Sequence, residues 1–96
     1  MALPPDEFPH AAGANLDYEI DWTPWLDAGD TISTDSWVVT GPDTALVLGT
    51  HSHTPTTATV WLSGGTAGSS YRVTGTIITA ANRTDLRTIK INAVAR

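Results

Sequence analysis

Apolar and polar residues alternate along most of this chain, and this period of two restricts the possible folds more than any other feature. Between residues 17 and 22 the odd positions are acidic, whereas the even positions are Tyr18, Ile20 and Trp22. The alternation returns in residues 57–62, 71–79 and 88–94. Because successive side chains of a strand point to opposite faces, each segment predicts a strand with one buried side. No long segment shows the 3.6-residue period of a helix.

Turn-forming residues separate the strand segments at residues 27–30, 41–43, 63–68 and 82–85. The 96 residues include 16 Thr, whose branched Cβ suits strands better than helices. About seven short strands in a chain of this length predict an all-β fold, an immunoglobulin-like β-sandwich spanning residues 17–96. A small jelly roll and an OB-type barrel are alternatives that fit the same pattern. Ala58, Val60 and Leu62 are expected in the core.

Tyr71 begins a strand directly after the Gly-rich segment 63–68. A tyrosine in this position, the tyrosine corner, is a feature of immunoglobulin-like sandwiches, where its hydroxyl bonds back to the preceding connection. We therefore expect Tyr71 to stabilise the fold and not to form part of a binding site.

Residues 1–16 are predicted to form an extended N-terminal arm outside the sandwich. Pro4, Pro5 and Pro9 lack backbone donors and favour extended conformations, and Leu3 and Phe8 are the only large apolar residues before Leu16. Ordering such a segment alone is opposed by a backbone entropy of about 1–2 kcal/mol per residue. The arm is thus expected to contribute to binding and not to stability, with Leu3 and Phe8 as apolar anchors on a partner.

Composition excludes several classes of protein. The chain has no Cys, which rules out a disulfide scaffold and a thiolate zinc site. The net charge of −5 argues against nucleic-acid binding. No apolar run reaches the roughly 20 residues of a membrane helix, and the N-terminal residues lack the basic segment of a secretory signal.

The charges are unevenly distributed along the chain. Residues 1–48 carry nine acids and no Lys or Arg, whereas residues 49–96 carry five bases and one acid. This asymmetry predicts either attraction to a partner or a second copy, or neutralisation within the folded domain.

The sequence contains no convincing catalytic or metal-binding motif. His51 and His53 alternate along the chain, but a useful metal site needs three or four ligands, so two solvated histidines in a turn are expected. The acids of residues 17–21 lack the ligand spacing of a calcium loop and fit a solvated strand face. Segment 63–68 matches neither a nucleophile elbow nor a phosphate loop. The sequence therefore predicts a protein without enzymatic activity, metal or cofactor.

Four Trp in 96 residues suggest a second kind of function, a carbohydrate-binding module with exposed indole rings. Buried rings would favour a scaffold, and a coplanar exposed pair would favour sugar binding. Trp61 is opposite in phase to Val60 and Leu62, which makes it the best single candidate for a contact residue.

The chain resembles a group of small virion proteins of tailed bacteriophages, described as fiber–tail adaptors or small structural proteins with immunoglobulin-like folds. The resemblance covers about Asp17 to Arg96 and is carried by residues 18–22, 30–37 and above all 60–73, with the Leu62–Gly68 phrase as its most specific part. It implies a non-enzymatic virion protein, assembled in the host cytoplasm, that either decorates the capsid or joins fibers to the tail. It further implies other virion proteins as partners and a homo-oligomer or symmetric array on the particle.

Overall fold

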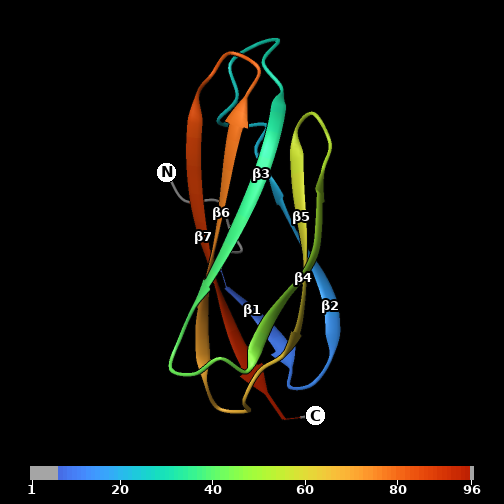
Figure 1. The fold of residues 1–96 in the computed structure, drawn as a ribbon, viewed down its shortest axis with the longest axis vertical. Coiled ribbons are helices and arrows are strands. Elements are labelled where there is room, and N and C mark those ends of the chain that lie inside the picture. The colour runs from blue at the N-terminus through green and yellow to red at the C-terminus, as the bar shows by residue number, and fades with distance from the viewer. Residues whose placement is uncertain (1–6, 96) are drawn as a thin grey trace.

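The computed structural model describes residues 7–95, which form seven strands in two sheets (Figure 1). The strands are β1 (Glu7–Ala11), β2 (Asn15–Asp21), β3 (Ile32–Thr40), β4 (Leu46–His53), β5 (Thr57–Gly64), β6 (Ser70–Thr79) and β7 (Thr84–Val94). The described residues include no helix long and apolar enough to cross a membrane. The predicted all-β fold is confirmed.

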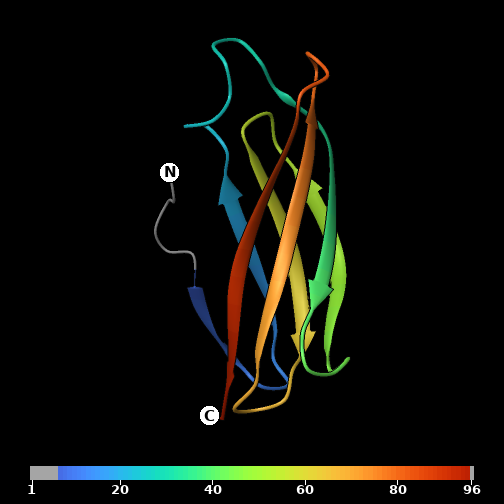
Figure 2. The ribbon, with the colours of Figure 1, turned by 90° about the vertical axis from the view of Figure 1, so that its left-hand side faces the viewer.

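The sheets have the strand orders β1-β7-β6-β3 and β2-β5-β4. Neighbouring strands are antiparallel except β1, which pairs in parallel with β7. Immunoglobulin-like sandwiches place strands B, E and D in one sheet and C, F and G in the other. The order of β2 to β7 is consistent with that arrangement, and β1 is added beside the last strand (Figure 2).

The core lies between the sheets and follows the predicted alternation. Ala58, Val60 and Leu62 are fully buried, and Tyr18 and Ile20 of β2 join them, whereas Leu16 is exposed. Burying each large apolar side chain contributes about 1.5–3 kcal/mol. From the other sheet, the core receives Ile32, Trp37, Tyr71, Val73, Ile77, Ile89, Ile91 and Ala93.

Gly75 makes room for the indole ring of Trp37, the largest side chain that the four-stranded sheet contributes to the core. A Cβ atom at Gly75 would lie 2.7 Å from a ring carbon of Trp37, closer than van der Waals contact allows. The glycine on β6 thus lets the indole of β3 lie flat against its neighbour strand.

Tyr71 occupies the corner position that its sequence context indicates. Its ring is buried, its hydroxyl accepts a hydrogen bond from the backbone N–H of Thr66 at 2.9 Å, and it donates one to Asp43 at 2.7 Å. Gly41 passes so close to the ring that a Cβ atom there would overlap it. Tyr71 therefore links the β5–β6 loop to the β3–β4 loop at one end of the sandwich.

The N-terminal segment differs from the predicted arm. Residues 7–11 are extended as expected, but they form β1 of the sandwich itself, and His10 is completely buried. Pro9 does not prevent this pairing, because it faces outward on an edge strand, where a missing donor is tolerated. The boundary expected at residue 16 therefore falls within the folded domain.

The strand β3 runs without a break from Ile32 to Thr40, with an irregularity between Ile32 and Thr34. His51 and His53 were expected in a turn, yet both lie in β4. A second irregularity, between Leu48 and His51, sets their direction.

Candidate functional site

Trp61 lies on the outer face of the three-stranded sheet, with 39% of its surface exposed. Its neighbours Val60 and Leu62 point into the core, so the alternation of β5 forces the indole outward. Across the sheet Trp61 pairs with Asp17, and Thr59 pairs with Glu19. We call the outward residues of this sheet the Trp61 face: Asp17, Glu19 and Asp21 on β2, Thr57, Thr59 and Trp61 on β5, and Val47 on β4.

The strand on the other side of Trp61 leaves the indole accessible. The irregularity in β4 places Gly49 beside Trp61, where a Cβ atom would be 3.2 Å from the Trp61 Cβ. Because glycine has no side chain, nothing from this position flanks the ring. Val47, two positions earlier on β4, is also exposed and adds apolar surface to the same face.

The carboxylates of the Trp61 face differ in their partners. Asp21 accepts hydrogen bonds from the hydroxyl and the N–H of Thr23 at 2.6 and 3.0 Å, and these bonds hold its pKa below the ordinary value. The side chains of Asp17 and Glu19 make no hydrogen bond or ion pair within residues 7–95. The indole therefore lies beside two carboxylates that are available to a partner.

The other three tryptophans have structural positions. Trp22 and Trp37 are buried in the core, and Trp25 is half-buried with the Arg87 guanidinium 4.6 Å from its ring centroid. No two of the four indoles form an exposed pair. Of the two arrangements distinguished from the sequence, this one favours a scaffold.

The two arm residues named as anchors have different outcomes. Leu3 lies outside the described residues. Phe8 is half-buried and meets the Tyr18 ring edge-on, with 5.5 Å between centroids. In this position Phe8 packs against the core of its own domain.

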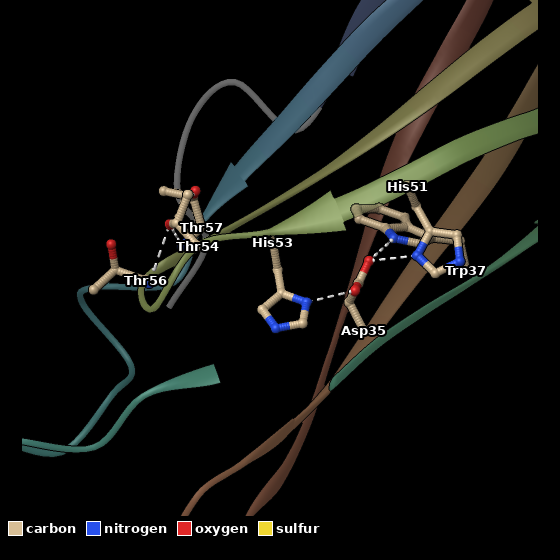
Figure 3. A network of polar contacts seen from close by, with 7 residues as sticks. All are labelled: Asp35, Trp37, His51, His53, Thr54, Thr56 and Thr57. Atoms are coloured by element: carbon tan, nitrogen blue, oxygen red, sulfur yellow. Dashed lines mark hydrogen bonds and ion pairs between the residues drawn. The ribbon is translucent and has the colours of Figure 1, made fainter. Parts of the chain in front are cut away.

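The histidines of β4 join the two sheets at one open edge (Figure 3). Asp35 on β3 accepts hydrogen bonds from Nδ1 of His51 at 2.8 Å and Nδ1 of His53 at 2.7 Å, and from Trp37 Nε1 at 2.9 Å. Since β3 and β4 are the edge strands of opposite sheets, the cluster closes that side of the sandwich.

The side chain of Asp35 is buried, with 6% of it exposed. Burial alone would raise the pKa of Asp35, but the hydrogen bonds from His53, Trp37 and His51 outweigh it and lower the pKa below its ordinary value. Asp35 is therefore ionised near neutral pH, and the cluster carries a buried charge with its hydrogen bonds satisfied.

A similar contact closes the opposite edge. His10 on β1 is 2.6 Å from the Tyr18 hydroxyl through Nδ1 and 3.1 Å from the Ala14 carbonyl oxygen through Nε2. Because a carbonyl only accepts, Nε2 donates, and Nδ1 accepts from the Tyr18 hydroxyl when the ring is neutral. The three histidines thus hold the edges of the fold together. Within residues 7–95, no three His, Asp or Glu side chains are grouped to hold a metal ion.

Sequence reasoning selected Trp61 but missed its surroundings. The pairing of Asp17 with Trp61 depends on strand register, and the contact of Asp35 with both histidines depends on how the sheets stack. From the His-x-His spacing one could predict only that both histidine side chains point to the same face of one strand.

The fold and this surface define a small β-sandwich domain with a flat candidate binding face. The chain belongs to the family described as podophage GP4 fiber-tail adaptor protein gp77, whose model matches residues 10–92. This confirms the resemblance to fiber–tail adaptors of tailed phages, and family membership implies a structural component of the virion. No curated protein matches the chain.

Proposed function

We propose that this protein is a non-enzymatic adaptor that joins fiber and tail proteins of the virion, and that the Trp61 face is its contact surface. The observation that carries the proposal is the exposed Trp61 beside Asp17, in a chain whose family is described as a fiber–tail adaptor. The other tryptophans and the histidine clusters already stabilise the fold, which leaves Trp61 as the large exposed aromatic group.

The chemistry of the Trp61 face fits a protein partner with basic groups. Tryptophan is enriched among residues that contribute 2 kcal/mol or more to protein interfaces, since its large surface is desolvated on binding. Asp17 and Glu19 would attract Lys or Arg side chains and orient the partner. The binding face is rigid because it lies on paired strands, so little entropy is lost on contact.

Two other functions also fit the sequence. Capsid decoration uses the same kind of protein contact, but the family description favours an attachment between tail and fiber. A carbohydrate-binding module needs exposed indole rings arranged as a platform. Trp22 and Trp37 are buried in the core and cannot form part of such a platform.

The proposal includes several copies arranged symmetrically on the particle. The Trp61 face lies on one sheet, whereas Arg72 projects from the outer face of the other, where it has no partner within residues 7–95. Opposite faces of complementary charge permit a head-to-tail contact between copies, which closes into a ring when the rotation allows. Leu3 remains in the proposal as a further partner contact.

The test measures attachment to particles assembled without this protein. Trp61→Ala at sub-saturating concentration should bind at least about tenfold fewer copies per particle, as expected for loss of a central aromatic contact. Leu86→Ala is the matched control, because Leu86 is 60% exposed on the opposite sheet. Both variants should unfold within about 1 kcal/mol of the wild type. Attachment of Trp61→Ala at the wild-type level would refute the proposed surface.

A further inference from the structure

A pocket of about 350 Å³ lies at the end of the sandwich where the β2–β3 connection meets the β6–β7 hairpin. Figure 1 shows these two segments together at the top of the molecule, away from the end held by Tyr71. The apolar residues that line the pocket are Trp25, Leu26 and Ile77. Neither the Trp61 face nor either histidine cluster contributes to it.

The polar lining of this pocket has an excess of negative charge. Asp27, Asp30 and Asp85 contribute three carboxylates, against the single guanidinium of Arg83. Arg83 is already paired with Asp27, with 2.6 Å between Nη2 and Oδ2. Arg83 also attracts Asp30, so one guanidinium serves two carboxylates and the lining keeps a net negative charge.

Asp30 is held in place by its surroundings. The Thr79 hydroxyl, together with the N–H groups of Thr31 and Ala81, lowers the pKa of Asp30 below its ordinary value, so it is ionised at neutral pH. These contacts hold Asp30 as a fixed, ionised carboxylate in the lining of the pocket, and its negative charge favours a cationic ligand.

We propose that this pocket binds an arginine side chain of a partner protein. A guanidinium offers five donors in a planar fork that matches carboxylates, and its alkyl stem can lie on apolar surface such as Leu26. The ring of Trp25 already accepts one guanidinium, that of Arg87, which shows that its environment suits this group. This contact is separate from the Trp61 face and does not depend on it.

The probe is N-acetyl-arginine methylamide, titrated into the full chain while the indole N–H resonances of the four tryptophans are followed by NMR. The Trp25 resonance should shift and saturate with a Kd on the order of 1 mM, a usual value for one side chain. The citrulline analogue, which has the same shape without the charge, should bind at least about tenfold more weakly.

Substitutions separate this proposal from the one on the Trp61 face. Asp85→Asn should weaken binding of the arginine probe about fivefold to tenfold, whereas Asp17→Asn removes the same charge from the Trp61 face and should leave it unchanged. A Trp25 resonance that does not move, equal binding of citrulline, or an unaffected Asp85→Asn variant would refute the arginine pocket. Saturation by methyl glucoside in place of the arginine probe would refute it in favour of a sugar site. None of these results depends on attachment to particles.

Discussion

At the scale of single residues, Tyr71 joins two connections through one hydroxyl group. The hydroxyl accepts from Thr66 and donates to Asp43, and the ring fills space that Gly41 leaves open. The bond from Tyr71, followed by the N–H of Ala45, holds the pKa of Asp43 below its ordinary value. The residue is buried and contacts no candidate binding surface, so its role is to position the loops at one end of the sandwich.

Tyr71→Phe should lower the free energy of unfolding by about 1–2 kcal/mol, because Thr66 N–H and Asp43 lose a partner while the ring remains. Tyr71→Ala should cost on the order of 3–5 kcal/mol, since it also leaves a cavity. Urea denaturation of both variants gives these values. Equal and negligible losses would show that the ring does not pack as described.

Asp35 is the second residue whose removal tests the structure. Its pKa is lower in the folded than in the unfolded state, where it is about 3.9. The stabilisation from this shift is therefore fully present above the unfolded pKa, and it is lost as the pH falls through the folded pKa.

Asp35→Asn should reduce stability at pH 7 by about 1–3 kcal/mol, because the histidines and Trp37 lose a charged acceptor. The difference from the wild type should shrink as the pH falls below about 4, because the Asp35 carboxylate is protonated first in the unfolded chain and, at still lower pH, in the folded one. Urea unfolding at pH 7 and below about pH 4 measures this difference in stability, with Asp17→Asn as a control at an exposed carboxylate. A deficit that stays constant in acid would contradict ionisation of Asp35 as the source.

At the scale of elements, β1 closes one edge of the sandwich. It pairs with β7 over five residues, places Phe8 against Tyr18 and buries His10 in a hydrogen bond to the same tyrosine. Glu7 adds an ion pair to Lys90 at 3.3 Å. This element therefore contributes to stability, which the composition of the N-terminal segment did not indicate.

Deletion of residues 1–12 should lower the unfolding free energy by several kcal/mol, on the order of 3–5, because it exposes the core beside β7 and leaves the Tyr18 hydroxyl without His10. His10→Ala should account for about 1–3 kcal/mol of this loss. Thermal and urea unfolding of both variants provide the measurement. An unchanged melting temperature after the deletion would mean that the segment is an arm without a structural role.

At the scale of the whole molecule, the alternation of apolar and polar residues predicted the core. The pairing of β1 and the contacts between the sheets depend on tertiary structure and could not be predicted in this way. Alternation placed Val60 and Leu62 inside and Trp61 outside, because one strand fixes those directions. It could not place β1 on β7, since that parallel pairing joins the two ends of the chain. Nor could it bring Asp35 to His51 and His53 across two sheets.

The charge asymmetry of the sequence is partly resolved within the fold. Arg83 pairs with Asp27 and Lys90 with Glu7, so bases of the second half neutralise acids of the first. Asp17 and Glu19 remain without partners within residues 7–95 on the Trp61 face. The molecule therefore retains negative charge beside its exposed indole, where a basic partner would bind.

The most direct measurement of the proposed function is a cryo-EM map of the whole virion at a resolution that shows side chains. We predict that each copy lies between tail and fiber proteins, with Trp61 buried against one of them and a basic side chain near Asp17. Symmetric copies around the tail would agree with the proposed array. Copies on the capsid surface, or copies whose Trp61 face points into solvent, would contradict the adaptor function through this face.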